Sequence, residues 1–316
     1  MKRAMMFPGQ GSQSVGMLAA LAAAEPVVGE TFSEASETLG YDLWELCQQG
    51  PVERLSETER TQPAMLAAGI ATWRAWGRRD GPKPDILAGH SLGEYSALVA
   101  AGALDFAATV ALVHFRGEAM QRAVPPGTGA MAAILGLDDA VIEAACREAA
   151  EGSVVQPVNY NSPGQLVIAG EAKAVGRAME ACKARGAKRA VLLPVSVPSH
   201  SALMKPAAEE LRERLLALAI HSPAIRVRSF DAGLYTDAPS IRDGLYRQLF
   251  NPVRWSAIVA AMMGEGAGQF FECGPGRVLT GLARRAPGGR DLVLHAIESP
   301  ESLTVALAAA RTEGKV

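Results

Sequence analysis

Short apolar runs alternate along this chain with longer stretches in which apolar residues recur three and four positions apart. The first run, at 4–7, leads into a loop at 8–13, and a helical stretch at 63–76 precedes the next run, at 85–88. That second run has the length of a buried strand, and another helical pattern follows it. Further runs of this kind lie at 225–230, 269–272 and 292–294. The alternation predicts an α/β protein whose mainly parallel sheet is covered by helices on both faces.

Between 127 and 197 the order of the predicted elements changes. A Pro-Pro-Gly sequence at 125–127 ends the helix predicted at 105–121. The elements after it run strand, helix, strand, strand, helix, strand, at 130–135, 138–150, 154–160, 165–169, 171–185 and 190–195. This βαββαβ order is the ferredoxin-like arrangement. We therefore expect a main domain formed by 1–126 and 198–316, with a ferredoxin-like subdomain inserted at 127–197.

The strand at 85–88 runs directly into the pentapeptide Gly89-His90-Ser91-Leu92-Gly93, which fits the pattern G-x-S-x-G. A serine on the sharp turn between a strand and a helix stands above the sheet, and flanking glycines allow a backbone that a Cβ would obstruct. The unpaired N–H groups of the following helix favour negative charge near the serine oxygen. This context predicts Ser91 as the nucleophile of an acyl transfer. The alternative is an incidental serine in a glycine-rich turn.

Ser91 needs a base to take its proton, and the chain has five histidines. His200 lies in a loop at the carboxyl end of a predicted strand, the edge at which active sites of open α/β sheets collect. His200 is therefore the predicted base. The alternatives are His90, His114, His221 and His295. No acidic residue between 91 and 200 lies in an obvious loop after a strand, so we expect a neutral acceptor to orient the histidine.

Two further features suit the binding of an acyl group. The N–H groups of the loop at 8–11, together with that of Leu92, are candidates for an oxyanion hole, and a plain tight turn is the alternative. Arg116 lies in an otherwise apolar helical segment, where an unpaired charge is costly. Its guanidinium should therefore pair with a carboxylate, either on a bound acyl group or elsewhere in the protein.

Composition narrows the class of protein. The chain has 316 residues, of which 49% are hydrophobic and 20% charged, so it can form a large core. A net charge of -2 gives no bias toward nucleic acid or an anionic membrane. The run at 17–24 is too short to span a bilayer and no signal-peptide core follows residue 7, so we expect a cytoplasmic protein.

The cysteines give no sign of a disulfide scaffold or a metal site. Cys47, Cys146, Cys182 and Cys273 are far apart and form no C-x-x-C pair. We expect reduced thiols, with a catalytic cysteine as the alternative. The basic residues of 183–189 are a candidate surface for an acidic partner, or a solvated helix end.

The chain resembles the malonyl-CoA:acyl-carrier-protein transacylases of bacterial fatty-acid synthesis over nearly its whole length. The matching blocks are FPGQGSQSVGM (7–17), TQPA (61–64), GHSLGEYSALVAAG (89–102), RGEAMQ (116–121), GTGAMAAILGL (127–137), VNYNSPGQLVIAG (158–170), GAKRAVLLPVSVPSHSALMKPAA (186–208), QLFNPVRW (248–255) and ECGPGRVLTGL (272–282). One segment departs: where the family usually carries an N-V-D-V-like run, this chain has Ser229-Phe230-Asp231-Ala232.

The resemblance implies a hydrolase-like α/β core with an inserted ferredoxin-like subdomain. It also implies transfer of malonyl from malonyl-CoA to the pantetheine thiol of acyl carrier protein, through a malonyl-serine intermediate and without cofactor or metal. Ser91 would be acylated and His200 would be its base. The N–H groups of Gln10 and Leu92 would form the oxyanion hole. A monomer is the expected assembly.

Two more roles follow from the resemblance alone. Arg116 would pair with the malonyl carboxylate, and the backbone carbonyl near Gln248 would orient His200 in place of the absent acid. The alternatives within the transferases are a trans-acting acyltransferase of a polyketide synthase or of a malonate decarboxylase system. Outside that class, a serine esterase or thioesterase would use the same serine, on the turn between strand and helix, with water as the acceptor. A non-catalytic interaction domain is the remaining alternative.

Overall fold

The larger of two lobes contains a mostly parallel sheet. The computed structural model describes residues 1–195 and 197–312. The strands of the larger lobe are β1 (Lys2–Phe7), β2 (Ile86–Gly89), β7 (Arg226–Arg228), β8 (Leu234–Tyr235), β9 (Ala267–Cys273) and β10 (Val293–Ile297). Within the described residues they form a six-stranded sheet in the order β10-β9-β1-β2-β7-β8. The pairs are parallel except β7 with β8, which confirms the predicted α/β class with a mainly parallel sheet.

Helices cover both faces of this sheet. Side chains alternate along each strand, so an apolar strand presents buried residues to both faces. Met5 and Phe7 of β1 belong to one buried cluster, whereas Ala4 and Met6 belong to another on the opposite face. The helices of the first cluster are α1 (Ala19–Ala24), α2 (Pro26–Leu39), α3 (Leu43–Gln49), α4 (Val52–Leu55), α5 (Thr58–Arg78), α6 (Gly93–Ala100), α7 (Phe106–Arg122), α10 (Lys205–Ala217), α11 (Ala238–Gln248) and α14 (Pro300–Arg311). The opposite face is covered by α12 (Trp255–Gly264) and α13 (Val278–Arg284). Among the described residues no helix has both the length and the apolarity to cross a membrane.

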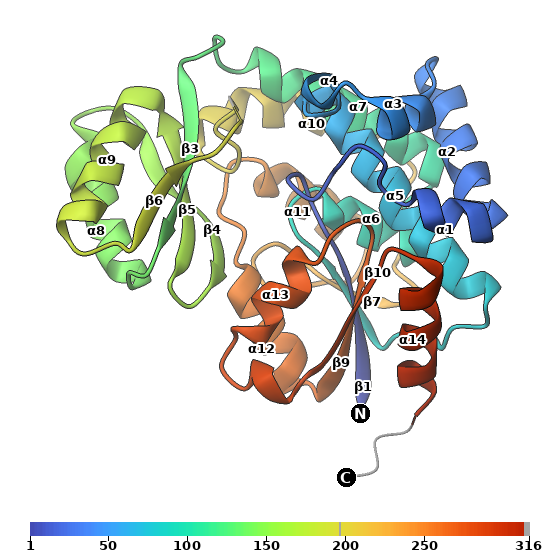
Figure 1. Ribbon diagram of the computed structural model, residues 1–316. Helices are drawn as coiled ribbons and strands as arrows, with labels where there is room; N and C mark the ends of the chain where they lie inside the picture. The colour runs from blue at the N-terminus through green and yellow to red at the C-terminus, as the bar shows by residue number, and fades with distance from the viewer. Residues whose placement is uncertain (196, 313–316) are drawn as a thin grey trace.

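The smaller lobe follows the predicted order of elements. Its elements are β3 (Gly129–Leu135), α8 (Asp139–Ala150), β4 (Val155–Ser162), β5 (Gln165–Glu171), α9 (Ala172–Ala184) and β6 (Arg189–Leu192). Its strands form an antiparallel sheet in the order β4-β5-β3-β6, and α8 and α9 pack on one face of it (Figure 1). β4 also contacts the larger lobe, because the N–H of Tyr160 donates to the carbonyl of Val253 at 2.9 Å.

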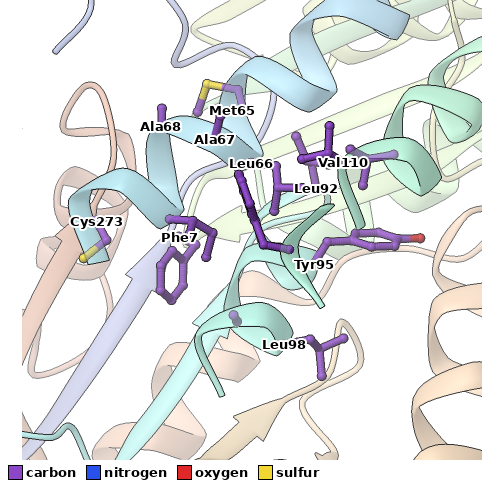
Figure 2. Close-up of a cluster of buried hydrophobic side chains, with 14 of the residues drawn as sticks. Phe7, Met65, Leu66, Ala67, Ala68, Leu92, Tyr95, Leu98, Val110 and Cys273 are labelled. Atoms are coloured by element: carbon purple, nitrogen blue, oxygen red, sulfur yellow. The ribbon is translucent and has the colours of Figure 1, made fainter. Parts of the chain in front are cut away.

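Packing around the carboxyl end of β1 fixes the turn that carries Ser91. Figure 2 shows side chains of α5, α6 and α7 gathered there, with Phe7, Leu66, Tyr95 and Val110 among the labelled residues. Leu92, next to Ser91, is also part of this cluster and is buried. The residue after the nucleophile and the first turn of α6 are therefore held by the core.

Two predicted boundaries were wrong for identifiable reasons. The helix expected at 63–76 begins at Thr58, so Pro63 lies inside α5. Proline has no N–H for the carbonyl of Glu59, and that carbonyl instead accepts from Nδ1 of His114 at 3.0 Å. The strand expected at 190–195 ends at Leu192, and the next residues turn back, with the N–H of Val195 donating to the carbonyl of Leu193.

Candidate active site

Ser91 lies in the turn between β2 and α6, where the backbone approaches itself closely. A Cβ on Gly89 would lie 1.9 Å from the carbonyl group of Gly93, and a Cβ on Gly93 would lie 2.0 Å from the main-chain oxygen of Phe7. Only glycine fits either position. Ser91 itself has a φ of 52°, in the left-handed region that a serine rarely adopts. The turn therefore carries backbone strain at the residue whose hydroxyl it presents.

The hydroxyl of Ser91 contacts the ring of His200. Oγ of Ser91 lies 2.7 Å from Nε2 of His200, and Nδ1 of the same ring lies 2.7 Å from the main-chain oxygen of Gln248. A carbonyl oxygen only accepts, so Nδ1 carries the proton and Nε2 is left to accept from the serine. A peptide carbonyl thus occupies the orienting position for which the sequence offered no acid.

His200 is held as a neutral base. Its side chain is buried, its φ is 64°, and burial lowers the pKa of its imidazole to about 3, with the positive charge of Arg116 contributing in the same direction. Near neutral pH the ring is therefore unprotonated and can accept a proton.

The other four histidines have different partners, and all lie in the described residues. Nε2 of His90 is 2.9 Å from Oδ1 of Asn161, and Nδ1 of His114 donates to the carbonyl of Glu59. His295 stacks on Phe271, and His221 is exposed. Of the five candidates, only His200 contacts the Ser91 hydroxyl.

Arg116, on α7, is buried without a carboxylate partner. Nη1 donates to Oε1 of Gln62 at 2.7 Å, and Nη2 donates to Oε1 of Gln248 at 3.0 Å. The ring of Tyr95 lies 5.5 Å from its guanidinium carbon. Within residues 1–195 and 197–312 no ion pair involves Arg116, and its Nε has no hydrogen-bond partner. The sequence allowed Arg116 to pair with a carboxylate of the protein or with one on a bound acyl group. Among the described residues, no carboxylate of the protein pairs with it.

A cavity of about 640 Å³ joins these groups. Its lining includes Gln10, Ser91, Leu92, Arg116 and His200 from the larger lobe, and Met131 and Asn159 from the smaller one. The main-chain N–H groups of Gln10 and Leu92 donate to no other group in the part of the chain that the structure describes. Both amides are thus available to an oxygen atom bound near Ser91.

Two buried residues at this site were missed by the sequence analysis. Glu94 is fully buried at the start of α6, and Gln62 is buried next to Pro63 on α5. The carboxylate of Glu94 accepts from Nε2 of Gln248 at 2.5 Å, and burial raises its pKa to about 7. A signal for both existed: each lies inside a block shared with the resembling family.

The four cysteines lie in environments that disfavour catalysis. The four cysteines are free and buried, and burial raises the pKa of Cys47 and Cys146 to about 12, which disfavours the reactive thiolate. In the basic segment, Lys183 pairs with Glu180 at 2.8 Å.

Among the described residues no group of three His, Cys, Asp or Glu side chains could hold a metal ion.

Comparison with known proteins decides the family. Residues 5–287 match the acyl transferase domain family. The chain is 57% identical over 305 residues to the malonyl CoA-acyl carrier protein transacylase of Escherichia coli strain K12, a match that covers 96% of this chain and 98% of that protein. The chain belongs to the malonyl CoA-acyl carrier protein transacylase family. It is therefore an acyltransferase.

Solved structures of this family share its fold. An acyl carrier protein S-malonyltransferase from Vibrio cholerae has a TM-score of 0.93 and 56% identity, covering 96% of this chain and 99% of that one. A malonyl-transacylase in complex with its type II PKS acyl-carrier protein has a TM-score of 0.96 and 55% identity, covering 98% of this chain and 100% of that one. By sequence, the chain is also 45% identical over 314 residues to the malonyl CoA-acyl carrier protein transacylase of Bacillus subtilis strain 168, with 99% of this chain and 98% of that protein covered.

Proposed function

We propose that the protein transfers a malonyl group from malonyl-CoA to the pantetheine thiol of acyl carrier protein, with Ser91 as the acylated nucleophile and His200 as its base. One observation carries this assignment of roles: Oγ of Ser91 lies 2.7 Å from Nε2 of His200 in a cavity also lined by Arg116, whose guanidinium forms no ion pair with any described residue. A nucleophile beside a neutral base, facing a fixed positive charge, suits an acyl donor with a carboxylate.

Acylation of Ser91 proceeds in two steps, attack on the thioester and departure of CoA. Oγ attacks the thioester carbonyl carbon while Nε2 of His200 takes the hydroxyl proton, and the carbonyl oxygen becomes an oxyanion that accepts from the N–H groups of Gln10 and Leu92. The C–S bond then breaks, and the CoA sulfur leaves with the proton held by His200. The second half reverses these steps with the pantetheine thiol as the nucleophile.

Arg116 is proposed to bind the malonyl carboxylate. Gln62 and Gln248 hold its two terminal nitrogens with neutral oxygens, so the positive charge is positioned without being neutralised. A carboxylate that enters the cavity would gain a charge-assisted pair in a buried setting, where such pairs are strong. An acyl group without the carboxylate leaves this charge unpaired, and that difference gives selectivity.

The orienting carbonyl of Gln248 favours a thiol over water as the second nucleophile. A neutral carbonyl stabilises the imidazolium form of His200 less than a carboxylate would, and burial lowers the pKa of this imidazole further. A thiol, with a pKa of about 8.5, loses its proton to a weak base far more readily than water does, with a pKa of about 16. The acyl-serine should therefore persist until a thiol arrives.

We also propose the finer architecture. Residues 1–126 and 198–316 form a hydrolase-like catalytic domain, supported by the serine turn between a parallel strand and the following helix. Residues 127–197 form a ferredoxin-like subdomain, supported by the βαββαβ order and the antiparallel sheet order β4-β5-β3-β6. The subdomain contributes Asn159 to the cavity wall.

Intact-mass measurement after mixing with malonyl-CoA tests the nucleophile. The wild-type chain should gain one malonyl group, and Ser91→Ala should gain none. Ser96→Ala is a matched control, because Ser96 is buried in the first turn of α6 and its hydroxyl has no hydrogen-bond partner in the described residues. An adduct on Ser91→Ala would refute the assignment.

A carrier protein of a polyketide synthase is the second candidate acceptor. The observation that favours it is the 55% identity to a malonyl-transacylase in complex with a type II PKS acyl-carrier protein. Transfer to purified carrier proteins of the two classes, measured under the same conditions, separates the alternatives. Release of free malonate at the same rate with and without carrier protein would instead indicate a thioesterase.

A further inference from the structure

Glu94 is a buried carboxylate beside the active site that the reaction described above does not use. We propose that Glu94 is a positioning residue, which holds Gln248 so that this one residue serves both the site for the acyl carboxylate and the base. The inference rests on the proposed function, because it concerns the same Arg116 and His200.

Gln248 contacts each part of the site with a different group. Its main-chain oxygen accepts from Nδ1 of His200, and its Oε1 accepts from Nη2 of Arg116 at 3.0 Å. Its Nε2 donates to the main-chain oxygen of Ser91 at 2.9 Å and to Oε2 of Glu94 at 2.5 Å. The residue at the end of α11 therefore touches the nucleophile's backbone, the base and the guanidinium at once.

The carboxylate of Glu94 decides which way the side-chain amide of Gln248 points. Glu94 accepts three hydrogen bonds, from Nε2 of Gln248, from the N–H of Phe230 at 3.2 Å and from the hydroxyl of Tyr235. The ionised form of Glu94 can accept all three, because neither oxygen then carries a proton. It requires the NH₂ end of the Gln248 amide, so the oxygen end faces Arg116.

A neutral amide at position 94 cannot reproduce this arrangement. If Glu94 were glutamine, its NH₂ group would face either the NH₂ of Gln248 or the N–H of Phe230, and both of these are donors. One contact would then be repulsive, and rotation of the Gln248 amide would relieve it by turning an NH₂ toward Arg116. The acyl-carboxylate site would lose the oxygen that holds its guanidinium.

Glu94 acts only through its neighbours. Its side chain is fully buried and does not line the cavity, so it does not touch a bound acyl group. A second fully buried carboxylate provides a comparison: Glu272 accepts from the N–H groups of Leu279 and Thr280 at the start of α13, on the opposite face of the sheet. Glu272 stabilises a helix end, whereas Glu94 is bonded to a residue of the site.

The test compares Glu94→Gln with Glu272→Gln as the matched control. The rate constant for acylation of Ser91 is measured with malonyl-CoA and with acetyl-CoA, and folding is checked by thermal melting. In Glu94→Gln the malonyl rate constant should fall about tenfold to a hundredfold, the range for one hydrogen bond to a charged group, and the acetyl rate constant should fall less. Glu272→Gln should leave the malonyl-to-acetyl ratio unchanged.

A double-mutant cycle separates positioning from a general structural effect. In an Arg116→Ala background, Glu94→Gln should no longer change the malonyl-to-acetyl ratio, because its route to that ratio passes through Arg116. If Glu94→Gln does not fold, Tyr235→Phe removes one of the three donors to the carboxylate and should shift the ratio in the same direction by less. An unchanged ratio in the folded variant would overturn the proposal.

The controls also keep the two proposals apart. If the wild-type chain gains no malonyl group on Ser91, the proposed function fails. If the wild-type chain is acylated normally and the ratio does not respond to the change at position 94, the proposed function stands and the role of Glu94 fails.

Discussion

The main-chain oxygen of Gln248 lies 2.7 Å from Nδ1 of His200 and occupies the orienting position that a carboxylate fills in a Ser-His-Asp triad. A peptide carbonyl fixes the tautomer of the ring as well as a carboxylate does, but it adds no negative charge. The base is therefore correctly oriented and weak. In the second half of the reaction such a base favours a thiol over water as the nucleophile, because the thiol is much the stronger acid.

Removal of the Arg116 guanidinium should affect malonyl far more than acetyl. In Arg116→Ala, the rate constant for acylation by malonyl-CoA should fall by about a hundredfold, because a buried partner of the acyl carboxylate is lost. The acetyl rate constant should fall much less. Stopped-flow or quenched single-turnover measurement with the two donors gives both values.

Arg74→Ala is the matched control for that experiment. Arg74 is a partly buried arginine on α5 that pairs with Glu34 at 2.7 Å and does not line the cavity. It should lower stability without altering the preference between donors. An equal loss of malonyl and acetyl transfer in Arg116→Ala would mean that Arg116 has a structural role only.

When glutamine replaces Glu94, the rate of acylation should be insensitive to pH over the range in which a free histidine titrates. A lowered pKa keeps an imidazole neutral to lower pH, and burial lowers that of His200 from 6.5 to about 3. Between pH 8 and pH 5 the acylation rate constant of Glu94→Gln, in which residue 94 does not titrate, should change by no more than about twofold, whereas a pKa of 6.5 for His200 would reduce its neutral fraction about thirtyfold.

In the wild-type chain the malonyl rate constant should fall as the pH is lowered through the pKa of Glu94, because the proposed positioning role requires an ionised carboxylate. The pKa of the Glu94 carboxyl is raised to about 7 by burial, and glutamine does not titrate. A decline that disappears in Glu94→Gln belongs to Glu94. A decline with a midpoint near 6.5 that persists would show that His200 titrates as a free imidazole.

The glycine before the nucleophile should be irreplaceable on steric grounds. A Cβ on Gly89 would lie 1.9 Å from main-chain atoms of Gly93, which cannot move aside as a flexible side chain could. Gly89→Ala should therefore lower the free energy of unfolding by at least about 3 kcal/mol, measured by urea denaturation.

The same change from glycine to alanine at position 176 should have the opposite effect on the free energy of unfolding. Gly176 is exposed within α9, and an added Cβ would meet nothing within 4 Å. Alanine should raise the free energy of unfolding by about 0.5–1 kcal/mol. Equal effects at the two glycines would contradict the steric account of the serine turn.

Local patterns were sufficient for most of the fold. The strand-turn-helix context of Ser91 and the βαββαβ order of the smaller lobe follow from hydrophobic spacing and from glycine and proline positions, which act over a few residues. The errors arose where distant groups intervened. Helix α5 passes through Pro63 because a histidine on α7 takes the carbonyl that proline leaves unpaired.

The sequence by itself determined which residues could do chemistry: a serine in an elbow, a histidine at a strand end and an arginine in an apolar helix. Apart from the contact between His200 and the carbonyl of Gln248, which the resemblance implied, it did not determine what each of them contacts. Only the tertiary structure brings residue 248 beside residues 91, 94, 116 and 200, since it lies far from all of them in the chain and meets them across the core. A hydrogen bond between such elements depends on their packing to within a few tenths of an ångström, and no periodicity in the chain encodes that distance.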